Sequence, residues 1–99
     1  MDQFEFDEQG TIKNKKGSNN QVGRVENDIV YNASRQQVGY LRDDAVYAGG
    51  NGAWGGQQVG YIRGNEYYLG GNGAWGGTRG GELSFPHPRW KLAAHLLLT

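Results

Sequence analysis

Three consecutive stretches of this sequence repeat one pattern: VGRVENDIVYNASRQQ (residues 22–37), VGYLRDDAVYAGGNGAWGGQQ (residues 38–58) and VGYIRGNEYYLGGNGAWGGTR (residues 59–79). The octapeptide GGNGAWGG occurs unchanged in the second and third stretches, at residues 49–56 and 70–77. The first stretch is five residues shorter, and the difference lies after the tyrosine that ends the common part. Because loops accept insertions and paired strands do not, the sequence predicts a repeated scaffold with a longer loop in two copies.

Each unit is expected to be a β-hairpin closed by a two-residue turn. The turns are residues 27–28, 43–44 and 64–65, which are Asn-Asp, Asp-Asp and Gly-Asn and accept a positive φ. This choice places apolar residues opposite one another and tyrosines opposite one another, and a shift of one residue destroys every pair at once. The expected pairs are Val25 with Val30, Leu41 with Val46, Ile62 with Tyr67, Arg24 with Tyr31, Tyr40 with Tyr47, Tyr61 with Tyr68, and Arg63 with Glu66.

Gly23, Gly39 and Gly60 stand two residues before the core residue of each unit, and hence on the same face of the strand. If this face looks inward, the missing side chains let neighbouring hairpins approach closely at a common axis. The outer face then carries a row of tyrosines, which is either a partner surface or, as we favour, a ladder of cross-strand stabilisers. This outer row consists of Arg24, Tyr31, Tyr40, Tyr47, Tyr61 and Tyr68.

Two further units are expected at the ends of the chain. FEFDEQGTIKN (residues 4–14) pairs Phe6 with Ile12 around a three-residue turn that ends at Gly10. At the other end, the 21-residue period places Leu83 where Ile62 stands in the preceding unit, so GGELSF opens a fifth hairpin.

The turn of the fifth hairpin is replaced by a proline-bearing link at residues 86–90. Residues 92–98 are then expected to return as a last strand that pairs with the N-terminal FEFD segment. Such a strand carries leucines on both faces and needs cover on both sides. The ring interior covers one side, and either Trp90 with the loop of residues 85–91 or a second copy of the protein covers the other. We therefore expect self-association through the C-terminal strand.

The sequence thus predicts one all-β domain over residues 1–99, with about five short hairpins arranged with pseudo-five-fold symmetry around an axis. Radial repetition of this kind leaves few exposed strand edges. The expected hairpin units are residues 4–14, 22–37, 38–58, 59–79 and 80–99.

A family resemblance supports this architecture. The pattern Val-Gly-(Tyr/Arg)-(Val/Leu/Ile)-x-x-x-x-(Val/Tyr)-Tyr resembles the small bacterial β-flower proteins, in their five-fold form above all, with the four-fold form related. The N-terminal EQGTIKNKKG, and Trp90 and Ala93–Ala94 before a bulky run, are similar to that group as well. The resemblance covers most of the chain and implies a β-flower-like ring, with no established chemistry to assign to residues.

Composition and charge narrow the function classes. Ten Lys and Arg balance ten Asp and Glu, and a neutral chain is not expected to bind nucleic acid, which needs a basic face. The absence of cysteine excludes disulfides, thiolate metal sites and cysteine nucleophiles. His87 and His95 have no regular spacing to carboxylates, and no nucleophile–base set or phosphate loop is visible. We therefore expect no metal, no cofactor and no catalytic residues.

The N-terminal residues give an expectation about targeting. MDQFEFDEQG has neither a basic region nor an apolar run, so no signal peptide is expected. The default expectation is cytoplasmic, and an exported mature form stays open. No apolar stretch is long enough to span a bilayer, so no membrane span is expected.

Trp54 and Trp75 occupy equivalent places in the two GGNGAWGG loops, three residues after Asn51 and Asn72. A surface indole beside amide groups suits a sugar, because the apolar faces of sugar rings stack on indoles while amides bind hydroxyls. The alternative, which we favour, is that each Trp folds back over the hydrophobic end of the domain. The string NEYYLGGNGAWGG also resembles the aromatic hairpin repeats of bacterial cell-wall and choline-binding modules.

We therefore expect a non-enzymatic structural or interaction module, of bacterial or phage origin. The alternative function is a carbohydrate- or cell-wall-binding module that uses the two loop tryptophans, with a glycan as partner. The candidate binding residues are Trp54, Trp75, Asn51, Asn72, Tyr47 and Tyr68.

Overall fold

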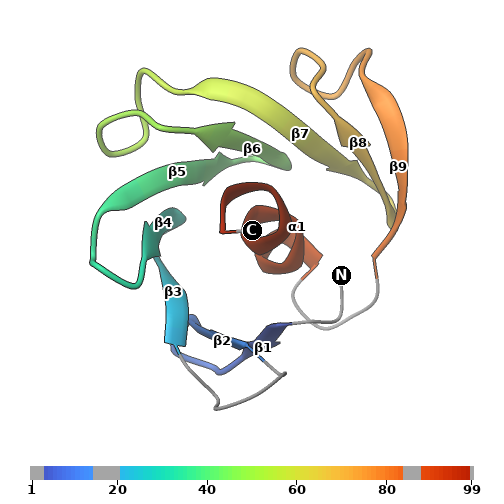
Figure 1. Ribbon diagram of the computed structural model, residues 1–99. Helices are drawn as coiled ribbons and strands as arrows, with labels where there is room; N and C mark the ends of the chain where they lie inside the picture. The colour runs from blue at the N-terminus through green and yellow to red at the C-terminus, as the bar shows by residue number, and fades with distance from the viewer. Residues whose placement is uncertain (1–3, 15–20, 84–87, 99) are drawn as a thin grey trace.

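The protein is nearly all β, as expected. The computed structural model describes residues 4–14, 21–83 and 88–98. In this part of the chain, nine antiparallel strands form one sheet in which neighbours along the chain are neighbours in the sheet, and one helix follows them. Figure 1 shows the sheet curving around this helix. The elements are β1 (Phe4–Phe6), β2 (Thr11–Asn14), β3 (Gln21–Glu26), β4 (Ile29–Asn32), β5 (Gln37–Arg42), β6 (Ala45–Ala48), β7 (Gln57–Arg63), β8 (Glu66–Leu69), β9 (Thr78–Glu82) and α1 (Pro88–Leu97).

The first four expected hairpins form in the expected register. β1 and β2 pair Phe6 with Ile12, and Gly10 in the turn has a φ of 86°. In the three central hairpins, β3–β4, β5–β6 and β7–β8, each expected apolar and aromatic pair lies directly opposite. Asn27 and Asp28 both have positive φ, at 53° and 63°, as a type I′ turn requires.

Successive hairpins pair with each other through the same irregularity, a shift of register. The pairing register shifts at Ile12/Lys13, Val30/Tyr31, Val46/Tyr47 and Tyr67/Tyr68, all between one hairpin and the next. Bulges of this kind bend a strand and increase its twist, which accounts for the curvature of the sheet around α1 in Figure 1.

The backbone bonds at these junctions also repeat. The N–H of a core residue donates to a carbonyl in the preceding turn at 2.7 to 2.8 Å in every junction. Leu83 donates to Asn65 as Ile62 donates to Asp44, so Leu83 holds the place that the 21-residue period predicts for it. The four bonds are Val25 to Gly10, Leu41 to Asp28, Ile62 to Asp44 and Leu83 to Asn65.

The C-terminal segment is a helix, so the expected last strand and its pairing with FEFD are wrong. Among the described residues, the fifth unit contributes one strand, β9, which pairs with β8. Residues 86–87 of the expected link and residues 84–85 before it lie outside the described residues, and residues 88–90 of the link begin α1. Residues 88–98 contain no β-branched residue and begin with a proline, and Ala, Leu, Lys and Arg favour a helix. Completion of the hairpin repeat suggested a strand, but local propensity and packing favour the helix. The expectation of self-association rested on that strand and now lacks its structural reason.

The helix also corrects the expected role of the three strand glycines. They do face inward, but among the described residues no neighbouring hairpin approaches them there. The atoms nearest to a Cβ at these glycines belong to the paired strand's carbonyl and to the leucines at the end of α1 and directly after it. Successive residues of an α-helix point in directions about 100° apart, so three consecutive leucines reach three different strands. A Cβ at the glycine would lie 2.8 Å from Leu96 at Gly60, 2.5 Å from Leu97 at Gly39 and 2.7 Å from Leu98 at Gly23.

The core lies between the concave face of the sheet and the helix. Leu92, Ala93 and Ala94 of α1 have no exposed surface. An ion pair of 3.6 Å between Arg89 and Asp28 also joins the first turn of α1 to the β3–β4 turn. Within the described residues, no helix combines the length and the apolarity needed to cross a bilayer. The other buried members of this core cluster are Phe4, Ile12, Val25, Val30, Leu41, Val46, Ile62 and Leu83.

Candidate functional site

Each GGNGAWGG loop closes on itself as a miniature hairpin. The N–H of Asn51 donates to the carbonyl of Trp54 at 2.8 Å, and Asn72 bonds Trp75 in the same way at 2.9 Å. The residue after each asparagine is a glycine with a φ of 62°, which is a conformation that other residues rarely adopt. The two loops therefore present Trp54 and Trp75 in the same local geometry.

A glutamine from the adjoining strand holds each loop. The Nε2 of Gln37 donates to the carbonyl of Gly52 at 2.7 Å, and the N–H of Gly52 donates back to Oε1 at 2.9 Å. Gln58 makes the same two bonds with Gly73, both at 2.8 Å. An amide side chain that both donates to and accepts from one residue fixes the loop backbone against the sheet.

Two tyrosines of the outer row lie beneath the loops. Tyr40 is 2% exposed, and its ring stacks on Tyr47 with 4.8 Å between centroids. Tyr61 is equally buried, stacks on Tyr68 at 4.9 Å and donates a 2.6 Å hydrogen bond to the carbonyl of Gly76. These stacked pairs confirm the interpretation as cross-strand stabilisers for the four tyrosines of β5–β6 and β7–β8. For Tyr40 and Tyr61, the interpretation as an exposed partner surface is wrong.

The two loop tryptophans project into solvent. Trp54 is 70% exposed and Trp75 is 76% exposed, so the expectation that each Trp folds back over the core is wrong. Glycine backbone of the loops already packs against the rings of Tyr40 and Tyr61, so the space beneath the loops is filled without the indoles. The guanidinium of Arg42 lies over the ring of Trp54, 5.2 Å from its centroid. This cation–π interaction helps to hold the indole in place.

A small hollow lies between the β5–β6 turn and the second GGNGAWGG loop. Its volume is about 220 Å³. It brings together Arg42, which contacts Trp54, the carboxylates of Asp43 and Asp44, and Tyr47. Gly73 and Ala74 of the second loop form its opposite side. Tyr47, and Arg42 that contacts Trp54, thus line one hollow with the loop that carries Trp75.

The other candidate binding residues have mixed roles. Asn51 and Asn72 close their loops through backbone groups, and their side chains are exposed. Tyr68 is half-buried, and its hydroxyl donates to Glu66 at 3.4 Å.

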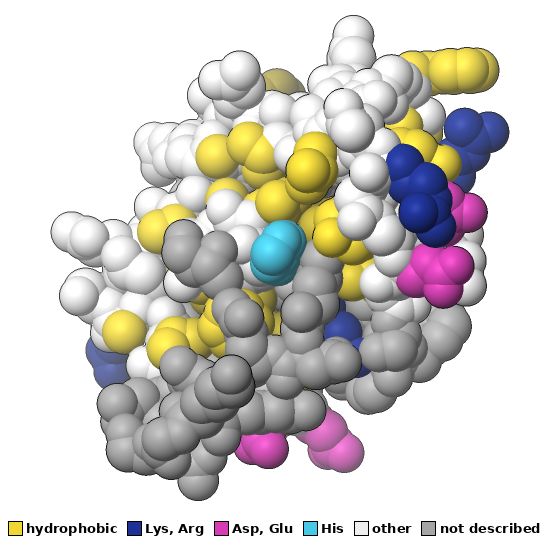
Figure 2. Space-filling model, turned by 45° about the vertical axis from the view of Figure 1, so that its right-hand side comes forward, with side chains coloured by type: hydrophobic (Ala, Val, Ile, Leu, Met, Phe, Trp, Pro, Cys, Tyr) yellow, Lys and Arg dark blue, Asp and Glu magenta, His cyan; other side chains and the backbone are white. Residues whose placement is uncertain are grey.

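The Glu66 carboxyl, near the second loop, has a displaced pKa. Nε of Arg79 donates a 2.6 Å hydrogen bond to Glu66, and this bond, with the charge of Arg79, lowers the pKa of the Glu66 carboxyl. Arg79 also lies 3.7 Å from Glu82. Figure 2 shows basic and acidic side chains side by side at one edge of the molecule. Both partners of the short pair are exposed, so it contributes little to stability.

Sequence reasoning missed Gln37 and Gln58, the residues that fix the loops. A signal was present, because a glutamine directly precedes Val-Gly at residues 21, 37 and 58. No group of three or more His, Asp or Glu suited to a metal ion occurs in residues 4–14, 21–83 and 88–98. Comparison with protein families, with curated proteins and with solved structures found no match.

Proposed function

We propose that this protein is a non-enzymatic binding module that contacts its ligand through Trp54 and Trp75. The observation that supports the proposal is the exposure of both indoles, at 70% and 76%, on loops that hydrogen bonds hold in place. The chain has few large apolar residues, and it leaves two of the largest in water. Aromatic anchors of this kind dominate the energy of many interfaces.

The order of the loops favours binding. A ligand that packs on a mobile loop loses affinity because the loop must be ordered, at about 0.5–1.5 kcal/mol for each immobilised side chain. Here Gln37 and Gln58 hold the backbone, and Tyr40 and Tyr61 support it from below. The backbone that carries the two tryptophans is therefore ordered before the ligand arrives.

The ligand class that we propose is a carbohydrate. Arg42, whose guanidinium lies over the ring of Trp54, also lines the 220 Å³ hollow together with Asp43 and Asp44. Sugar hydroxyls both donate and accept, so they match such a mixed set, while an indole takes the apolar face of the ring. The arrangement supports a glycan rather than a purely apolar partner.

The test is a glycan array followed by titration of any glycan retained, with Trp54→Ala, Trp75→Ala and the double variant. We expect each single change to weaken binding at least tenfold, and Trp54→Phe to retain part of the affinity because it keeps a stacking face. Leu69→Ala, a change of another exposed apolar residue outside the loops, is the matched control and leaves binding unchanged.

Two outcomes contradict the proposal at different levels. If no glycan is retained and none protects the tryptophan fluorescence from iodide quenching, the carbohydrate class is wrong. If a ligand binds the double variant as tightly as the parent, the tryptophan loops are not the binding site.

We also propose kinship with the β-flower proteins and a five-fold arrangement of the units. The support is that the same register shift and the same backbone bond recur at all four junctions between β2 and β9. Superposition of successive hairpins in an experimental structure tests this, since five-fold symmetry requires equal rotations between neighbours. Unequal rotations would overturn it.

A further inference from the structure

The repeat unit of residues 22–37 differs from those of residues 38–58 and 59–79 on the outer face of the sheet. Gln21, directly before this unit, is equivalent to Gln37 and Gln58, which hold the GGNGAWGG loops, and Arg24 is equivalent to the buried Tyr40 and Tyr61. The connection from β4 to β5, residues 33–36, is too short to cover these positions. A GGNGAWGG loop covers this part of the outer face in the units of residues 38–58 and 59–79. In the unit of residues 22–37 the same part is therefore uncovered.

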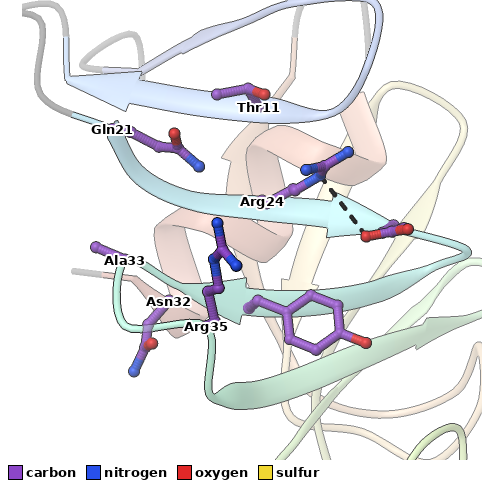
Figure 3. A pocket seen from close by; sticks show the side chains of 8 residues that line it. Thr11, Gln21, Arg24, Asn32, Ala33 and Arg35 are labelled. Carbon is purple, nitrogen blue, oxygen red and sulfur yellow. Dashed lines mark ion pairs between the residues drawn. The ribbon is translucent and has the colours of Figure 1, made fainter.

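A hollow of about 530 Å³ lies at this place, a volume that suits a small molecule. Figure 3 shows side chains from β2, β3, β4 and the following turn around it. The polar groups that line it include Thr11, Gln21, Arg24, Glu26, Tyr31 and Arg35. Gln37 and Gln58 use their amides on loop backbone, whereas in the described part of the chain the amide of Gln21 has no hydrogen-bond partner.

Arg35 occupies an unusual backbone position. Its φ is 63°, and the other described residues with positive φ are glycines or the Asn and Asp of hairpin turns. Asn32 fixes this turn, because its Oδ1 accepts from the N–H groups of Ser34 and Gln36 at 2.9 and 3.0 Å. Glycine or asparagine would adopt this conformation more easily, so stability does not explain an arginine here. Residues in such conformations cluster at ligand-binding sites.

The charge of the hollow is positive. Arg24 lies 3.7 Å from Glu26, which offsets one of the two arginines only loosely. Within the described residues, the guanidinium of Arg35 has no ion-pair partner. Figure 3 shows its side chain extending from the turn into the space between β3 and the β4–β5 connection. Two guanidinium groups that face one space suit a carboxylate or a phosphate, which they bind with paired N–H donors.

We propose that this hollow binds a small organic anion, with a carboxylate or phosphate between Arg24 and Arg35 and its organic part against Tyr31. The ligand fills the place that the GGNGAWGG loop fills in the other two units, and Gln21 bonds it as Gln37 and Gln58 bond their loops. This site is separate from the tryptophan loops, so the two proposals stand independently.

The experiment is an NMR titration of the full-length ¹⁵N-labelled protein with phenyl phosphate and, separately, benzoate. Saturable shifts are expected at Arg24, Tyr31 and Arg35 for at least one probe, and added salt should weaken them. The probe that binds more tightly shows which acidic group the site prefers. Inorganic phosphate, which lacks the ring, should bind at least tenfold more weakly than phenyl phosphate.

Arg35→Gly is the deciding variant. Glycine adopts a φ of 63° freely, so the fold should be retained while the guanidinium is lost. We expect at least a tenfold loss of affinity for the preferred probe, and a similar loss for Arg24→Gln. Arg63→Gln is the matched control, because Arg63 is an exposed arginine of β7 that does not line the hollow, and it should bind like the parent.

Binding by Trp54→Ala should also equal that of the parent, which separates this site from the tryptophan loops. The proposal is overturned if neither probe gives saturable shifts at these residues. It is equally overturned if Arg35→Gly binds as tightly as Arg63→Gln.

Discussion

Gly60 of β7 lies directly against Leu96 of α1, and a Cβ at Gly60 would be 2.8 Å from Cδ1 of that leucine. The same Cβ would be 2.8 Å from the carbonyl oxygen of Tyr68. The contact is possible only because the strand has no side chain there. Gly39 and Gly23 make equivalent approaches to Leu97 and Leu98, so the repeated glycine is what admits the helix into the curve of the sheet.

Gly60→Ala should destabilise the protein, and Leu96→Ala should recover part of that loss in the double variant. We expect about 1–3 kcal/mol for the single change, because the added methyl overpacks the contact between strand and helix. Urea denaturation of the parent, both single variants and the double variant measures the coupling. Strictly additive effects would show that Gly60 and Leu96 do not share the contact.

Leu92→Ala should lower the free energy of unfolding by about 2–5 kcal/mol, because Leu92 is fully buried and its truncation leaves a cavity in the core. Leu69→Ala is the matched control. Leu69 is 40% exposed, so less apolar surface returns to water and we expect a loss of less than about 1 kcal/mol. Thermal or urea unfolding compares the two. Equal losses would contradict the placement of α1 at the centre of the core.

Gln58→Ala should loosen the second loop without unfolding the domain. The variant loses two hydrogen bonds to Gly73 and one to the carbonyl of Gly70, each contributing about 0.5–1.5 kcal/mol, so the loop should open more often. Hydrogen exchange of the Asn72 amide, which bonds Trp75, should accelerate roughly tenfold. The neighbouring Gln57→Ala removes an exposed side chain and should leave this rate unchanged. An unchanged exchange rate in Gln58→Ala would show that the loop's own backbone hydrogen bonds keep it closed without Gln58.

Arg79→Gln should raise the pKa of Glu66 toward its ordinary value of 4.5, because the hydrogen bond and the charge of Arg79 lower it in the parent. With a lowered folded-state pKa, the folded protein binds fewer protons than the unfolded chain. This contribution to stability is therefore present above pH 4.5 and is lost as pH falls through the folded-state pKa. The effect on stability is small because both groups are exposed.

An NMR titration of the Glu66 carboxyl carbon measures this change. Arg63→Gln is the control, since Arg63 is the weakest of the influences on Glu66 and its loss should raise the pKa less. A larger rise in Arg63→Gln than in Arg79→Gln would contradict the assignment.

The candidate site was only partly predictable from the sequence. Trp54 and Trp75 were identified because two identical octapeptides place them in equivalent positions. Their exposure was not predictable, because it depends on Tyr40 and Tyr61 already filling the space beneath the loops. The hollow at Arg24 and Arg35 required the positions of three strands and a turn at once. Its sequence signal was the shorter first unit, with an arginine where the others carry tyrosine.

The sequence by itself determined the register of the first four hairpins. Pairs such as Leu41 with Val46 and Tyr40 with Tyr47 are local, and turn chemistry and side-chain alternation both fix them. Only the tertiary structure decided which residues pack against the strand face that carries Gly23, Gly39 and Gly60. Extension of the hairpin repeat predicts a strand at Leu96, Leu97 and Leu98. Three consecutive leucines show neither the alternation of a strand nor the spacing of a helix, so the run itself does not decide between them. They form the end of a helical segment because three glycines on three strands leave room around one axis, and only a helix sends consecutive side chains to all three.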